Sequence, residues 1–145
     1  MKGSNIMEQL YRAMRQSDDK WLYGLYLDER VHNTDYPCIV PLKTIANDGD
    51  WKVKKNTVSQ WIGLTDKNGQ KIFEGDIVKD VQSNYLYQIK WYEQYACFAL
   101  GNYKGIIEID RDIEEYISDL QVIGNIWDNP AELNYYENLY KDINY

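Results

Sequence analysis

Two turns, set close together between short apolar segments, constrain this chain more than any other feature. The first is Asp66-Lys67-Asn68-Gly69 and the second is Glu74-Gly75-Asp76. Asn-Gly readily supplies the positive φ values that a tight hairpin needs, and glycine between two acids permits a sharp entry into a strand. We therefore predict strands on both sides of each turn. Structural roles in and around these turns are assigned to Gly63, Asp66, Asn68, Gly69, Gly75 and Asp76.

Short apolar segments separated by turn residues recur along the rest of the chain. The 14 Tyr and five Trp, against two Phe, favour strands and half-buried positions. Strands are predicted at residues 21–27, 38–40, 51–53, 58–64, 71–73, 77–79, 84–92, 97–100 and 121–127. A polar loop is predicted at 28–37 and a short helix at 110–120, whose apolar residues share one face. Residues 6–15 fit a capped helix or a strand. The pattern indicates a mainly β fold, a β-rich α+β class.

Charge and cysteine usage exclude several classes of protein. The formal net charge is −7, and residues 107–145 alone carry two basic and ten acidic residues. This excess disfavours non-specific nucleic-acid binding, which relies on Lys and Arg. Cys38 and Cys97 lie among apolar neighbours and form no CxxC pair, so we expect buried free thiols and no structural zinc. No signal peptide or long apolar run is evident, which favours a cytoplasmic location.

Three parts of the sequence resemble the YopX family of phage and prophage proteins. The central part contains Gly63-Leu64-Thr65-Asp66-Lys67-Asn68-Gly69 and Ile72-Phe73-Glu74-Gly75-Asp76-Ile77-Val78. An opening at 11–24 and an ending at 122–130 fit in the expected order. The resemblance covers about residues 11–133 and implies a phage or prophage origin. It also implies that Tyr11 to Met14 form a strand, and it implies no activity and no catalytic residues.

The resemblance further implies an SH3-like small barrel in the C-terminal half. The resulting domain prediction is an N-terminal β region at 7–68, an SH3-like barrel with short helices at 69–128, and an acidic helix at 129–145. Asn129-Pro130 is typical of a helix start, and Leu133, Tyr136, Tyr140 and Ile143 form an apolar stripe after it. This helix can pack on its own barrel or on a second copy, and the sequence favours neither.

Candidate chemical groups are few. Glu74 and Asp76 form a close carboxylate pair, but strand-entry geometry explains Asp76 without chemistry. The turn starting at Asp66 resembles the beginning of a calcium loop yet lacks its later acidic ligand. His32 is the single histidine, and no phosphate-binding glycine loop is present. We therefore predict a protein that is not an enzyme, with no cofactor and no metal site.

The aromatic residues after position 84 are the best candidates for binding. Alternation places Tyr85, Tyr87, Ile89 and Trp91 on one face of a strand, which we assign to the core. Tyr92, Tyr95 and Tyr103 are then the candidate binding residues. The favoured function is a protein-interaction module that binds a host or phage protein or itself. The alternative is a nucleic-acid-binding module that uses exposed barrel aromatics. Catalysis by Glu74 and Asp76 is the third hypothesis.

Overall fold

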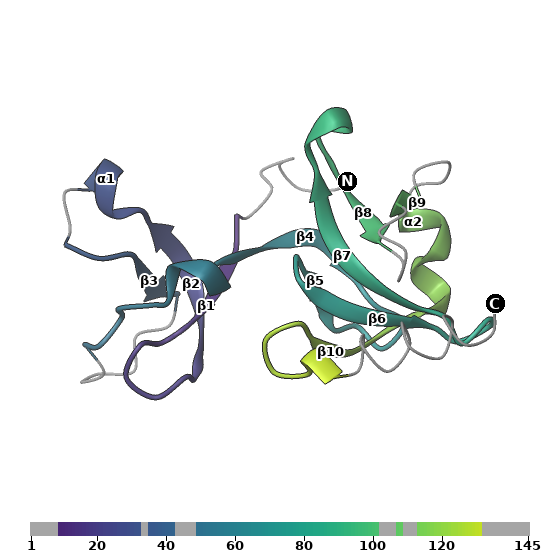
Figure 1. Ribbon diagram of the computed structural model, residues 1–145, viewed down its shortest axis with the longest axis horizontal. Helices are drawn as coiled ribbons and strands as arrows, with labels where there is room; N and C mark the ends of the chain where they lie inside the picture. The colour runs from purple at the N-terminus through teal and green to yellow at the C-terminus, as the bar shows by residue number, and fades with distance from the viewer. Residues whose placement is uncertain (1–8, 33–34, 43–48, 102–106, 109–112, 132–145) are drawn as a thin grey trace, which may run out of the picture. The chain divides into compact units, whose positions relative to one another are not determined.

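The computed structural model describes residues 9–32, 35–42, 49–101, 107–108 and 113–131. The chain divides into two compact units, residues 1–61 and 62–145. The division falls within strand β4 (Ser59–Thr65), earlier than the predicted boundary after residue 68. Figure 1 shows the strands of both units, which form antiparallel sheets and confirm the predicted β-rich class.

The described residues of the first unit form three complete strands, the beginning of β4 and two short helical segments. In chain order these are β1 (Tyr11–Met14), β2 (Trp21–Leu27), α1 (Glu29–His32), β3 (Cys38–Pro41) and the 3-10 turn η1 (Lys55–Thr57). Strand β1 confirms the strand interpretation of a segment whose local pattern also fits a helix. The prediction of a loop throughout 28–37 is wrong at α1. Asp28 accepts the backbone N–H of Arg30 at 2.8 Å, and this cap begins the helical turn.

Hydrogen bonds connect the strands of the first unit in a ring. β1 pairs with β2, and β2 pairs with β3. The segment at 51–54 closes the ring, because Ile39 donates to the carbonyl of Trp51 and Lys54 donates to that of Met14. The ring encloses a small core of Ala13, Ile39 and Val53, all fully buried.

The second unit holds a five-stranded antiparallel sheet in the order β10-β6-β7-β8-β9. Besides the end of β4, the elements of this unit are, in chain order, β5 (Lys71–Phe73), β6 (Asp76–Asp80), β7 (Leu86–Tyr92), η2 (Glu93–Tyr95), β8 (Cys97–Gly101), β9 (Ile107–Glu108), α2 (Ile113–Tyr116), η3 (Ile117–Asp119) and β10 (Leu120–Asn125). The predicted helix at 110–120 corresponds to α2 and η3. SH3-like closure of this sheet stays a prediction.

One apolar cluster fills the second unit. It consists of Ile72, Val78, Ile89, Leu100, Ile113 and Leu120, with Ile62, Leu64 and Phe98 among the half-buried residues around it. These residues come from strands β4, β5, β6, β7, β8 and β10 and from α2, so the cluster binds the sheet to the helix. The alternation predicted for β7 therefore places Ile89 correctly in the core.

Three further sequence predictions concern the C-terminal helix, membrane-spanning segments and the two cysteines. Pro130 and Ala131 are helical, and the apolar stripe of the predicted acidic helix lies outside the described residues. Within the described ranges, no helix is long and apolar enough to cross a membrane. Both cysteines are free thiols, but they are half-buried instead of buried.

Candidate functional site

The turn that resembles a calcium loop is a hydrogen-bonded clamp. Asp66 is 6% exposed, and its Oδ1 accepts the backbone N–H groups of Asn68 at 2.8 Å and Gln70 at 3.0 Å. Its Oδ2 accepts the N–H of Val122 in β10 at 2.9 Å. Both carboxylate oxygens therefore bind backbone groups. Among the described residues, no group of three or more His, Cys, Asp or Glu is placed to hold a metal.

The second turn places its two carboxylates in different surroundings. Asp76 is 1% exposed and its Oδ2 accepts the N–H of Phe73 at 2.8 Å, which fixes the strand entry. Glu74 is half-buried, and this burial raises the pKa of its carboxyl group. Since Asp76 is engaged by the backbone, the geometry gives a structural role to one member of the predicted pair.

Gly75 is the point at which three parts of the second unit meet. It has φ of 84°, its N–H donates to Ile89 at 2.8 Å, and its carbonyl accepts the N–H of Ile126 at 3.0 Å. A Cβ at this position would lie 2.5 Å from the ring of Trp127. The close approach therefore requires glycine. Of the other predicted glycines, Gly69 (φ 80°) lies in its turn, whereas Gly63 (φ 87°) lies inside β4.

The hairpin of β7 and β8 carries exposed aromatic side chains at its η2 end. Trp91 faces Phe98 across the strands, with ring centroids 5.0 Å apart and planes at 69°. Tyr92 and Tyr95 form a second ring pair at 5.2 Å. The structure thus brings two of the three predicted binding residues together, and Tyr103 lies outside the described residues.

The prediction that Tyr85 and Trp91 belong to the core is wrong. Tyr85 is 43% exposed and Trp91 is 44% exposed. They lie at opposite ends of the strand face that buries Ile89, Tyr85 just before β7 begins and Trp91 near its η2 end. Alternation identifies the face of a strand, but it does not indicate where along that face the core ends.

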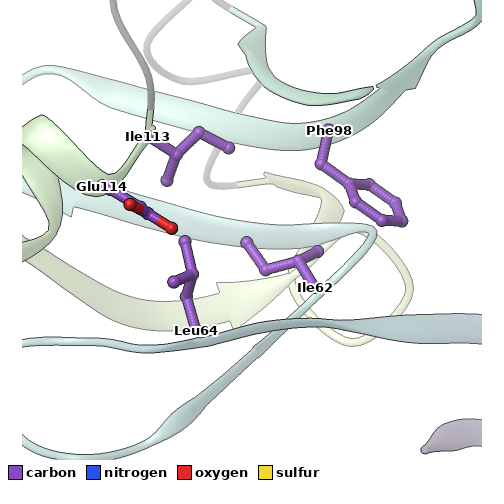
Figure 2. Close-up of a pocket in the computed structure, with 5 residues that line it drawn as sticks. All are labelled: Ile62, Leu64, Phe98, Ile113 and Glu114. Carbon is purple, nitrogen blue, oxygen red and sulfur yellow. The ribbon is translucent and has the colours of Figure 1, made fainter. Parts of the chain in front are cut away.

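A pocket of about 280 Å³ lies beside Phe98. We call it the Phe98 pocket, and Figure 2 shows the five side chains that line it: Ile62, Leu64, Phe98, Ile113 and Glu114. They come from β4, β8 and α2. Four of the five are apolar, and the carboxylate of Glu114 is the charged group of the lining. The ring pair with Trp91 extends the apolar surface from Phe98 toward solvent.

The second unit is strongly acidic. Residues 62–145 contain seven Lys or Arg and fifteen Asp or Glu, a formal net charge of −8, whereas residues 1–61 contain nine and eight, a net charge of +1. Glu114 and Glu115 are both exposed. The Phe98 pocket is therefore an apolar site in a unit whose field attracts cations.

Sequence reasoning missed the Phe98 pocket. Ile62 and Leu64 alternate on one strand, and Ile113 begins a helical stripe, so each residue reads as ordinary core. Their meeting with Phe98 depends on long-range packing. The alternation of Ile62 and Leu64 across Gly63 was the available signal, since it marks a shared face of β4.

A family model and a solved structure are similar to this chain. The model of the family described as YopX protein matches residues 10–134. The crystal structure of protein EF1440 from Enterococcus faecalis is similar, with a TM-score of 0.58 and 20% sequence identity over 86% of this chain and 97% of that chain. At this identity the likeness shows the fold alone. No curated protein matches the chain.

Proposed function

We propose that this chain, which belongs to the YopX family, is a non-enzymatic protein-interaction module of phage or prophage origin. Its binding surface is the Phe98 pocket together with Trp91, and its partner is a host or phage protein in the bacterial cytoplasm. The observation that carries the proposal is the pairing of an exposed Trp91 with the ring that lines an apolar pocket. Exposed aromatic residues beside an apolar pocket are typical anchors of protein interfaces.

Two features support binding over catalysis. Asp76 is buried and accepts a backbone N–H, so the carboxylate pair offers no free partner for acid–base chemistry. The pocket volume of about 280 Å³ is at the lower end of the range typical of small-molecule sites and is sufficient for one large side chain of a partner.

The test is affinity capture from nuclease-treated host lysate with two matched variants. Trp91→Ala removes an exposed aromatic beside the pocket, and Tyr85→Ala removes an equally exposed aromatic from the far end of β7. We expect a protein that the wild type and the Tyr85 variant retain and that the Trp91 variant loses at least about tenfold. Equal retention by all three baits, or retention by none, contradicts the proposal.

Nucleic-acid binding is the second candidate, and the Tyr92–Tyr95 ring pair favours it. Tyr95 is 55% exposed and its ring is tilted at 41° to that of Tyr92, and exposed aromatic rings are platforms on which unpaired bases stack. A single-stranded oligonucleotide should then quench the fluorescence of Trp91 at low salt, with the quenching lost in Tyr95→Ala and weakened by added salt. Unchanged fluorescence at low salt excludes this function.

Self-association is the remaining form of the interaction proposal. It rests on the apolar stripe predicted after Pro130. Deletion of residues 130–145 should lower the molar mass measured by light scattering if the chain associates through that stripe. An unchanged mass removes this form and leaves binding to another protein.

A further inference from the structure

We propose that the Phe98 pocket takes an apolar side chain from a basic segment of another protein, and that Glu114 selects the basic residue beside it. This inference rests on the proposed function and adds the chemistry of the partner. The occupant is an extended or helical segment with one aliphatic or aromatic anchor close to a Lys or Arg.

The lining of the pocket supports an apolar anchor next to a cation. Ile62, Leu64 and Ile113 offer carbon atoms only, so burial of an apolar side chain against them gains the hydrophobic contribution without leaving polar groups unpaired. The carboxylate of Glu114 lies at the same pocket, as Figure 2 shows. An anchor that carries a neighbouring Lys or Arg can fill the pocket and pair with Glu114 at once.

Trp91 gives the cation a second favourable position. Its indole is 44% exposed and meets the ring of Phe98 edge to face. An Arg or Lys placed over an exposed indole face gains a cation–π interaction. Phe98 lines the pocket and its ring also pairs with the indole, so both sites share this residue and lie within reach of one short segment.

The charge of the molecule argues against the other occupants. Residues 132–145 of this chain carry Glu132, Glu137 and Asp142 against Lys141, so this segment brings net negative charge to Glu114. A second copy of the chain carries a formal net charge of −7 as a whole. Nucleic acid is repelled in the same way. A basic protein segment is the occupant that this electrostatic field favours.

The experiment selects binders from a displayed library of random 12-residue peptides, with the full chain as bait. We expect enriched peptides to share an aliphatic or aromatic residue within three positions of Lys or Arg, and to be poor in Asp and Glu. Synthetic copies should bind Glu114→Gln about 2- to 5-fold more weakly and Glu114→Lys at least about tenfold more weakly than the wild type. Glu115→Gln, a neighbouring exposed acid outside the lining, is the matched control and should bind as the wild type does.

Each other outcome overturns the inference in a recognisable way. Peptides that lose affinity in Trp91→Ala but carry no basic residue, or that bind Glu114→Lys normally, leave the proposed function intact and remove the role of Glu114. Competition by a synthetic 132–145 peptide would make this chain's own segment the occupant. A molar mass that falls in Trp91→Ala would make the occupant a second copy. If no peptide is enriched, segment recognition fails, while the lysate capture still decides the proposed function.

Discussion

Glu74 and Asp76 differ in the free-energy cost of burying their carboxyl groups, although only Gly75 separates them in the sequence. Asp76 is buried with a backbone N–H donor at 2.8 Å, so its carboxylate is compensated. Partial burial raises the pKa of the Glu74 carboxyl group, because it disfavours the charged form. Asp76 should therefore stabilise the fold, and Glu74 should destabilise it once its carboxyl group is ionised.

The raised pKa of Glu74 predicts a pH-dependent gain from Glu74→Gln. A carboxyl group with a higher pKa in the folded state binds its proton more tightly there, so ionisation lowers stability as pH rises from the ordinary value of 4.5 through the raised value. The Gln variant, which cannot ionise, should have a higher urea midpoint than the wild type at pH 7 and an equal midpoint near pH 3.5. Glu93→Gln removes the same charge from the exposed η2 segment and should change neither midpoint. A Gln variant that is less stable at pH 7 would contradict this reasoning.

Removal of the Asp76 carboxylate should cost stability instead of an activity. Asp76→Ala leaves the N–H of Phe73 buried without its acceptor, which corresponds to about 1–3 kcal/mol of unfolding free energy. Urea denaturation followed by Trp fluorescence measures the loss. If the variant kept wild-type stability, the structural assignment of Asp76 would fail and the hypothesis of a catalytic carboxylate would regain support.

At the scale of elements, the Asp66 clamp fastens the β4–β5 hairpin to β10. Asp66→Ala removes the acceptor of three backbone N–H groups, one of them 56 residues away, and should lower the free energy of unfolding by about 2–4 kcal/mol. Asp80→Ala is the control, since Asp80 accepts only local N–H groups in an exposed turn and should lose under about 1 kcal/mol. Equal losses in both variants would show that the bond to Val122 contributes nothing.

The same clamp shows which parts of the fold local sequence can predict. The Asp-Asn-Gly turn and the alternation of β7 are local patterns, and strands β2 and β5 occur at the predicted residues. The bond from Asp66 to Val122 is not local, and neither is the meeting of Phe98 with Ile113 in the pocket. Two short elements, α1 and β9, were also missed, because a four-residue helix or a two-residue strand has too few residues to show a period.

At the scale of the whole molecule, two separate apolar cores predict two separable folding units. The core of Ala13, Ile39 and Val53 belongs to the first unit, and the cluster around Ile89 and Leu100 belongs to the second. Strand β4 belongs to both, since it pairs with β1 through Ser59 and Gln60 and continues past Trp61. A substitution that destabilises only the first core should therefore unfold the first unit while the second unit stays folded.

Gly24 offers the means to test this separation. A Cβ at this position would lie inside contact distance of the carbonyl oxygen of Val40, where β2 pairs with β3, whereas a Cβ at Gly49 would meet nothing within 4 Å. Gly24→Ala should therefore force β2 from β3 and speed amide hydrogen exchange in β1, β2 and β3 at least about tenfold, while Gly49→Ala should not. Exchange in β6, β7 and β8 should stay at the wild-type rate in both variants, as measured by mass spectrometry of peptic peptides. Equal acceleration in β6 to β8 would instead mean that β4 couples the two cores into one cooperative unit, and that a partner bound at the Phe98 pocket would stabilise the first unit as well.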